Sequence, residues 1–231
     1  GVALGGVVGL GTVATFAWRL PAGMGAPRTD ALRELRDFNR RPVWLTLGIG
    51  AIGFAGMFSV FSYLTPTLLQ VTGVGESFIP FALMTFGIGS ILGTLAGGWL
   101  FARFGFPAAG IVLLWSMAIL LLFQLAARSA WLVLPVVLAV GTMGALATVL
   151  QSHLMDVAGH AQTLAAASHH AAFNAANALG PWLGGLAITA GYGWTSTGYV
   201  GAATALGGLL IYAMAMRDLR GRDAVADTAA G

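Results

Sequence analysis

Seven apolar stretches, each long enough or nearly long enough to cross a lipid bilayer, constrain the fold of this chain more than any other feature. A spanning helix needs about 20 mostly apolar residues. None of the seven stretches contains an aspartate, a glutamate or an arginine. They cover residues 1–18, 43–64, 79–101, 108–126, 131–150, 164–189 and 195–216.

The composition agrees with a chain that lies mostly within a membrane. Hydrophobic residues make up 58% of it and charged residues only 8%, whereas about a quarter of an ordinary soluble domain is charged. The 34 glycines suit membrane helices, in which small residues permit close packing. The sequence therefore predicts an all-α, polytopic membrane helical bundle whose main partner is the lipid bilayer.

Several classes of function lack the residues that they need. The basic residues flank apolar stretches, which indicates membrane topology and no nucleic-acid partner. The absence of cysteine excludes disulfides and a thiolate metal site. No nucleophile motif, phosphate-binding loop or pair of intramembrane carboxylates is present. We therefore expect no enzyme activity, no cofactor and no metal.

The arginines predict which side of the membrane each loop faces. If the connector 19–42 is cytoplasmic, ten of the eleven arginines lie inside and only Arg128 lies outside. Such a bias is typical of cytoplasmic loops. Residues 43–216 then form a six-helix bundle, and residues 217–231 form a cytoplasmic tail. Because the apolar stretch 1–18 begins directly at Gly1, we interpret it as part of a longer helix and the chain as a fragment.

The stretch 164–189 carries the polar groups most relevant to function. On a helix, residues three and four apart share one face. His170, Asn174 and Asn177 form such a row, named here the polar stripe. Facing lipid would be costly for these side chains, so they should face protein or a water-filled path. Hydrogen bonding between helices remains an alternative to substrate contact, and whether the histidines titrate stays open.

Small and aromatic residues follow the same helical spacing elsewhere. A row in 79–101 and a second row beside the polar stripe predict close helix packing; these residues are Gly89, Gly93, Gly97, Gly180 and Gly184. Phe58, Phe61 and Tyr63 are candidates for the wall of a substrate cavity. Packing in the core or against lipid is the alternative for this aromatic row.

A short polar segment connects the stretches 131–150 and 164–189. It contains His153, Asp156 and His160. The spacing does not match known pairs of metal ligands on helices, and no fourth ligand is evident. We therefore expect a solvated cytoplasmic turn.

The segment GGWLFARFG, residues 97–105, resembles the loop signature of the major facilitator superfamily. Gly98, Leu100, Arg103 and Gly105 match that signature, whereas Ala102 replaces its usual acidic residue. The segments HHAAFNAANALGPWLGG and FSYLTPTLLQVTG resemble the drug:proton antiporter branch, in the group of arabinose or sugar efflux permeases. The resemblance spans nearly the whole chain and matches the C-terminal half of such a transporter, preceded by its sixth helix.

This resemblance implies a transporter of the bacterial inner membrane that works by alternating access. The implied partners are protons as the coupling ion, a small-molecule substrate such as a drug, sugar or metabolite, and an N-terminal half that is missing here. Gly98, Arg103 and Gly105 would belong to a gating loop, in which Ala102 removes a charged partner. A seven-span scaffold or receptor without transport activity is the alternative from a different class.

Overall fold

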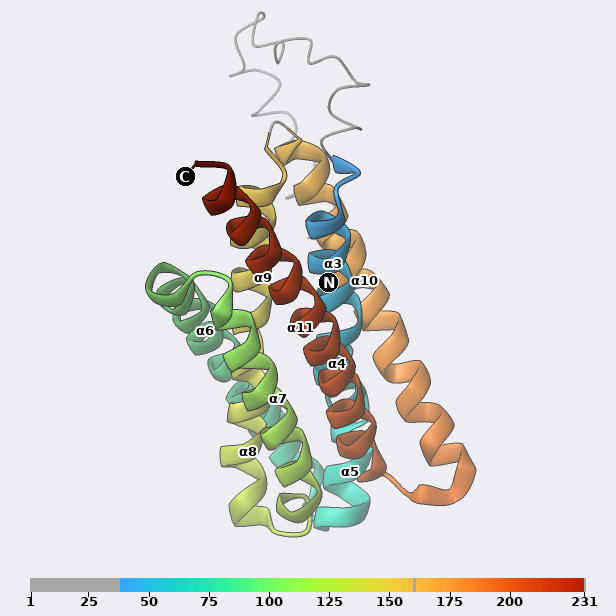
Figure 1. Cartoon of the computed structure of the whole chain (residues 1–231). Helices are drawn as coiled ribbons and strands as arrows, with labels where there is room; N and C mark the ends of the chain where they lie inside the picture. Colours follow the sequence, from blue (N-terminus) through green and yellow to red (C-terminus); the bar gives the residue numbers. More distant parts are fainter. Residues whose placement is uncertain (1–37, 160, 231) are drawn as a thin grey trace, which may run out of the picture.

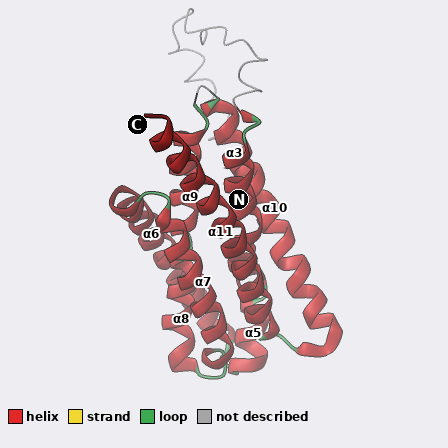
Figure 2. Cartoon of the chain, in the orientation of Figure 1, coloured by secondary structure: helices red, strands yellow, loops and turns green. Residues whose placement is uncertain are grey.

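The computed structural model describes residues 38–159 and 161–230. In these residues the chain forms long helices joined by short loops and contains no strand (Figure 1, Figure 2). The prediction of an all-α bundle is therefore confirmed. The predicted helix 1–18 and the connector as far as residue 37 lie outside the described residues.

The first part of the bundle consists of two long helical units. The first unit bends repeatedly and is divided among α3 (Arg41–Gly48), the π-helical segment η1 (Ile49–Gly53), α4 (Ala55–Ser62), α5 (Leu64–Thr67) and the π-helical segment η2 (Leu68–Thr72). The second unit is continuous, and it comprises the 3₁₀ turn η3 (Glu76–Phe78) and helix α6 (Ile79–Phe104).

The second part adds four units that run up and down the bundle. They are α7 (Pro107–Ala126), the pair α8 (Ala130–Thr142) and α9 (Ala145–Val157), α10 (Gln162–Ala187) followed by the π-helical segment η4 (Ile188–Tyr192), and α11 (Ser196–Ala230).

Proline and glycine mark several of the helix boundaries. Pro42, Pro80 and Pro107 occupy the first turns of α3, α6 and α7, where a missing N–H costs no hydrogen bond. Gly105 ends α6 with a φ of 63°, a left-handed conformation that glycine adopts without a steric penalty. The hairpin between α6 and α7 is therefore dictated by local sequence.

Five described helical units are long and apolar enough to cross a membrane: Arg41–Ser62, Glu76–Phe104, Pro107–Ala126, Ala130–Val157 and Ser196–Gly221. Helix α10 has 26 residues, which is sufficient length. However, its histidines and asparagines lower its hydropathy, and it is not among these five. It occupies the predicted stretch 164–189 and carries its polar residues in the middle of the helix.

Two helices run further than the membrane stretches that the sequence predicts. The stretch 131–150 continues to Val157, since the chain turns at Met143 and Gly144 and then resumes as α9. The stretch 195–216 continues as α11 to Ala230, so the predicted tail 217–231 starts as a helix. In both cases polar residues extend an apolar helix beyond the part that a membrane would cover.

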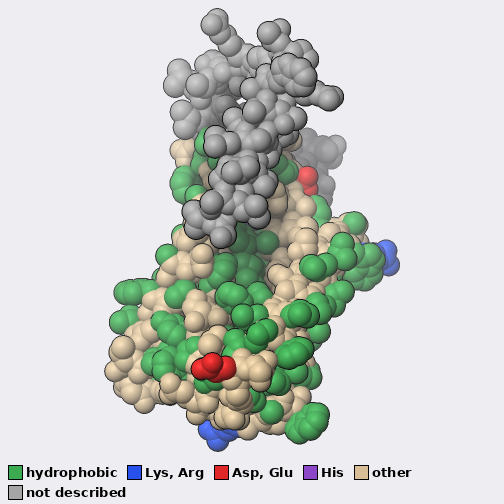
Figure 3. All heavy atoms as spheres, turned by 180° about the vertical axis from the view of Figure 1, so that it is seen from behind, with side chains coloured by type: hydrophobic (Ala, Val, Ile, Leu, Met, Phe, Trp, Pro, Cys, Tyr) green, Lys and Arg blue, Asp and Glu red, His purple; other side chains and the backbone are tan. Residues whose placement is uncertain are grey.

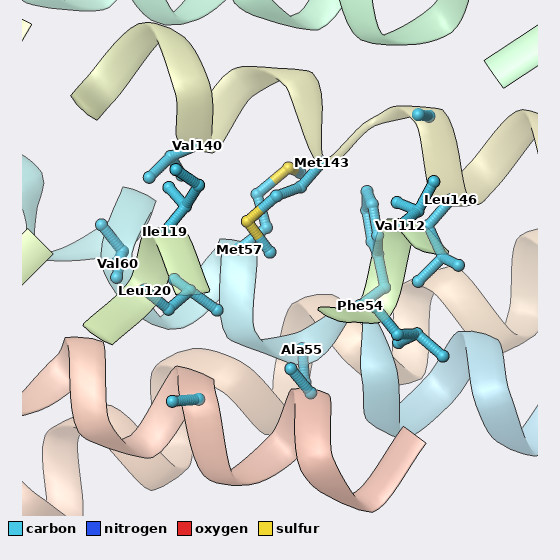
Figure 4. Packing of buried hydrophobic residues seen from close by; sticks show 14 of the residues in the cluster. Phe54, Ala55, Met57, Val60, Val112, Ile119, Leu120, Val140, Met143 and Leu146 are labelled. Atoms are coloured by element: carbon cyan, nitrogen blue, oxygen red, sulfur yellow. The ribbon is translucent and has the colours of Figure 1, made fainter. Parts of the chain in front are cut away.

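The core lies where α4, α7, α8 and α9 meet. Figure 4 shows Phe54, Met57, Leu120, Met143 and Leu146 directed into this region, and each of these side chains is buried. Burial of one such side chain contributes roughly 1.5–3 kcal/mol when the alternative is water. Because lipid replaces water in a membrane, close packing holds these helices together.

Helix α6 lies at the edge of the bundle (Figure 1). Only 17% of the most apolar 18-residue segment of Glu76–Phe104 is buried, compared with 67% of the corresponding segment of Arg41–Ser62. Its contacts are mainly with α8 and α9. Most of its surface is therefore available to lipid or to another helical unit.

Candidate functional site

Helix α10 has one packed face and one exposed face. His169, Ala176, Gly180 and Gly184 are buried on the first face. The polar stripe of His170, Asn174 and Asn177 is exposed on the other. The two rows that helical spacing distinguishes in the sequence thus lie in two different environments.

The packed face of α10 is built from small residues because α4 lies very close. A Cβ atom at Gly180 would collide with the backbone oxygen of Ala55, and one at Gly184 would lie 2.8 Å from the Ser59 hydroxyl. Gly180 and Gly184 therefore permit an approach that no larger residue allows. This contact fixes the direction in which the polar stripe points.

Two hydrogen bonds reinforce this corner of the bundle. The Ser59 hydroxyl donates to the backbone oxygen of Thr197 at 3.2 Å, which joins α4 to α11. The Tyr63 hydroxyl donates to the backbone oxygen of Pro181 at 2.9 Å, which joins the end of α4 to α10. Tyr63, a candidate for the cavity wall, thus uses its hydroxyl to hold α10 in place.

Replacement of Tyr63 by phenylalanine tests this role. Tyr63→Phe removes the bond to Pro181 and should cost about 1 kcal/mol of stability. The melting temperature in detergent should fall by about 2–4 °C. Tyr199→Phe makes the same change on a tyrosine that is 60% exposed and should not lower it. Equal melting temperatures for Tyr63→Phe and the wild type would contradict the structural role.

The three aromatic candidates for the cavity wall do not all lie near the same helix. Phe58 is partly buried, and its ring meets Phe54 edge-on with centroids 5.4 Å apart. Phe54 in turn lies 4.4 Å from Phe173 of α10. Phe61 is 37% exposed and packs 4.3 Å from Phe86 of α6. Tyr63 thus contacts α10 directly, Phe58 is linked to it through Phe54, and Phe61 contacts α6.

The two adjacent histidines of α10 differ sharply in environment. His169 is 5% exposed, and its ring centroid lies 4.6 Å from that of Phe173. His170 is exposed, with its ring centroid 5.8 Å from that of His169. Only His170 is therefore placed to meet a ligand or a further helical unit.

The glycine row of α6 lies against the pair α8 and α9. A Cβ atom at Gly93 would lie 2.5 Å from the backbone oxygen of Thr142, and one at Gly97 would lie 2.6 Å from that of Ala145. Gly89 contacts the backbone at Leu138 in the same way. These three glycines give α6 its closest contact within the described bundle.

The residues of the loop signature lie at the end of α6. Gly105 ends the helix, and its N–H donates to the backbone oxygen of Phe101 at 2.7 Å. Arg103 is exposed, and a Cβ atom at Gly98 would meet no described atom within 4 Å. Gly98 and Arg103 are thus accessible to a segment that approaches from outside the described bundle.

The expected solvated turn between the fifth and sixth predicted stretches is shorter than the sequence indicated. His153 lies on α9, is 8% exposed and stacks on Phe106 with centroids 3.9 Å apart. Asp156 is exposed, and His160 lies outside the described residues. The prediction for His153 is wrong because α9 extends past the predicted end at residue 150 and carries it into a packed position.

No group of three or more His, Asp or Glu side chains in the described part of the chain could hold a metal ion. In the view of Figure 3, hydrophobic side chains cover much of the described surface and charged ones are few. The chemistry available at the exposed face of α10 is therefore hydrogen bonding by amides and an imidazole. Such groups can bind and orient a polar molecule.

Several contacts that build this region gave no signal in the sequence. Ser59 and Thr197 are 138 positions apart. Trp194 donates from Nε1 to the Gln70 side-chain oxygen at 3.1 Å, over 124 positions. Each residue type is common in apolar stretches, so only the fold identifies its partner.

Comparison with known proteins places these features in a family. Residues 47–230 match the model of the Major Facilitator Superfamily. The chain is 31% identical over 213 residues to the inner membrane transport protein YdhP of Escherichia coli (strain K12). That alignment covers 90% of the chain and 54% of YdhP. It is 32% identical over 192 residues to the uncharacterized MFS-type transporter YtbD of Bacillus subtilis (strain 168). That alignment covers 80% of the chain and 48% of YtbD.

A third relative is named for a substrate class. It is a probable sugar efflux transporter of Haemophilus influenzae (strain 86-028NP), 28% identical over 197 residues, with 84% of the chain and 48% of that protein covered. The chain thus spans about half the length of these relatives. No protein of known structure gave a significant match.

All three relatives are named as transporters, in agreement with the prediction that the chain is not an enzyme. The family match covers most of the chain and includes both the loop signature and the polar stripe. A multi-pass helical bundle is the architecture that this match requires, and the described residues have it. The chain belongs to the Major Facilitator Superfamily of transporters.

Proposed function

We propose that the chain is the C-terminal half of a proton-coupled efflux transporter for small molecules such as drugs, sugars or metabolites. A second six-helix half would complete it, and the two halves would alternate access to a central site. The observation that carries the proposal is the exposed polar stripe on α10. A helix otherwise suited to a membrane presents His170, Asn174 and Asn177 to the outside of the described bundle.

The cost of exposing amides to lipid supports an interface at this face. Asparagine and histidine side chains within a membrane are expensive unless they meet protein or water. Within the described bundle, the opposite face of α10 packs on α4. The polar stripe therefore needs a further partner, and a substrate path between two halves supplies one. Phe58 and Tyr63 would form part of the adjoining wall, with Phe61 nearer to α6.

Efflux of a sugar-like or drug-like molecule suits the side chains of this surface. Amides both donate and accept hydrogen bonds, as the hydroxyls of a sugar do. One relative is named for sugar efflux, which adds support for a polar substrate. The described part of α10 has no carboxylate that could carry the coupling proton. Acidic groups of the other half would therefore chiefly bind and release it.

Gly98, Arg103 and Gly105 would form a gating loop at the end of α6. Gly105 sets the turn, and Gly98 leaves room for an approaching helix. The exposed Arg103 would pair with an acidic group of the other half. Because Ala102 carries no acid of its own, this loop would contribute a single charge to the closed gate.

The proposed orientation places the C-terminus in the cytoplasm. Arg41 and Asp218 form an ion pair of 2.7 Å that joins the start of α3 to α11, so these helix ends lie on the same side. Arg128 and Glu76 lie at the opposite end of their helices. The positive-inside rule favours the arginine-rich end as cytoplasmic.

Single cysteines test this orientation in intact cells. Glu76→Cys and Arg128→Cys should react with an impermeant thiol reagent, whereas Asp30→Cys should react only after the cells are permeabilised. The chain has no cysteine of its own, which keeps its background low. Reaction at position 30 in intact cells, or protection at both other positions, would reverse the orientation.

Proton-coupled efflux is tested with the complete transporter in everted membrane vesicles. In energised vesicles, addition of L-arabinose or ethidium should dissipate the pH gradient reported by a fluorescent dye, because protons would leave as the substrate enters. Vesicles without the transporter are the control. Accumulation of a substrate with no change in the gradient would contradict proton coupling, and no accumulation of either probe would contradict efflux of these classes.

A further inference from the structure

A second region of the bundle, away from the polar stripe, has the form of a binding groove. It lies where the end of α7 meets the start of α11 and has a volume of about 400 Å³. Its lining includes Gln124, Tyr192, Ser196, Tyr199, Val200 and Ala203. None of these residues belongs to the proposed substrate path.

Gln124 is the unusual member of this lining. The side chain is only 8% exposed, and its amide nitrogen has no hydrogen-bond partner in the described part of the chain. A buried donor without an acceptor is destabilising, and in folded proteins nearly all such groups are paired. Gln124 therefore brings a buried, unpaired donor to the wall of the groove.

The position of the groove identifies the class of molecule that would supply this acceptor. Gln124 lies two residues before the end of the candidate span Pro107–Ala126, and Ser196 begins the span Ser196–Gly221. Both residues thus lie at the level where a bilayer passes from acyl chains to glycerol esters and phosphates. Tyr192 and Tyr199 are 76% and 60% exposed, as tyrosines at this level commonly are.

The groove continues from this level towards the middle of the membrane. Ser196, Val200 and Ala203 follow one face of α11 over about 10 Å, at 1.5 Å per residue, and the last two are apolar. A phospholipid matches both parts, since its ester and phosphate oxygens accept hydrogen bonds and its acyl chain is apolar. Among the described residues, no lysine or arginine lines the groove, which disfavours a soluble anion.

We propose that this groove binds one phospholipid from the leaflet at that end of the bundle. The Gln124 side chain turns its buried amide nitrogen into the groove and donates to an ester or phosphate oxygen, and one acyl chain lies along Val200 and Ala203. The lipid completes the contact between α7 and α11. This role needs only that the bundle lies in a membrane and is independent of the proposed transport function.

Lipid binding is measured on the purified full chain in detergent, by native mass spectrometry and thermal unfolding, with palmitoyl-oleoyl phosphatidylglycerol as the probe. Gln124→Leu removes the donor at similar size, Ala203→Phe fills the groove, and Gln151→Leu is the matched control on an exposed glutamine of α9. Wild type and Gln151→Leu should bind the lipid and melt at a higher temperature with it. Gln124→Leu should bind about tenfold more weakly.

Two further results complete the test. Without lipid, Gln124→Leu should melt no lower than the wild type, because it removes an unpaired buried donor. Ala203→Phe should also lose the stabilisation by lipid, and it decides the test alone if Gln124→Leu does not fold. Wild-type affinity in Gln124→Leu or Ala203→Phe would overturn the proposal. Equal stabilisation by inorganic phosphate alone would overturn it too, because the acyl chain would then play no part.

Discussion

Gly93→Leu is expected to remove most of the folded protein from the membrane. Even a Cβ atom at this position would lie 2.5 Å from the backbone oxygen and 2.7 Å from the Cα atom of Thr142. Backbone atoms cannot rotate away, so α6 would have to separate from α8. Overpacking costs about 1–3 kcal/mol and sometimes more, and about 1.4 kcal/mol already changes a folding equilibrium tenfold.

Gly87→Leu is the matched control for this prediction. It lies on the same helix, and a Cβ atom there would meet no described atom within 4 Å. The measurement is the amount of protein that elutes as a single species in size-exclusion chromatography after mild solubilisation. Similar amounts for Gly93→Leu and Gly87→Leu would show that the close contact of α6 with α8 is not needed for folding.

Helical spacing predicted much of this architecture because the signals are local. The positions of Gly89, Gly93 and Gly97, four residues apart, are sufficient to place them on one face of a helix. The same spacing separated the polar stripe from the small residues of α10.

Features that depend on distant contacts could not be predicted in this way. His153 is in a packed position because α9 resumes after the turn at Gly144 and brings it onto Phe106. The hydroxyl of Tyr63 finds its acceptor 118 positions away. Gln124 looks like an ordinary polar residue near the end of a span, and only the packing of α11 against α7 reveals its unpaired amide.

The second large effect is expected in transport by the complete protein. Asn174→Ala should reduce efflux of the transported probe about tenfold, the effect of losing one hydrogen bond of about 1.4 kcal/mol. The amount of protein in the membrane should stay nearly unchanged, because the exposed side chain makes no close packing contact within the described bundle. The double variant with Asn177→Ala should reduce efflux further.

Ala175→Ser is the control, since residue 175 is exposed on α10 but lies off the polar stripe. If the asparagines instead join helices, Asn174→Ala should lower protein yield and melting temperature together with transport. His170→Gln adds a separate readout, because a titrating histidine would shift the pH dependence of efflux when replaced. Normal efflux in both asparagine variants, at normal expression, would exclude the polar stripe from the substrate path.

The central claim is that the polar stripe faces a water-filled path between two halves, and cysteine accessibility tests it most directly. In the complete transporter, Asn174→Cys should react with a small charged thiol reagent, and a transported substrate should slow the reaction. Leu210→Cys, on a residue of α11 that is 60% exposed and at a similar depth in the bundle, should face lipid and stay unreactive. Unreactive Asn174→Cys, or equal reaction at both positions, would contradict the claim.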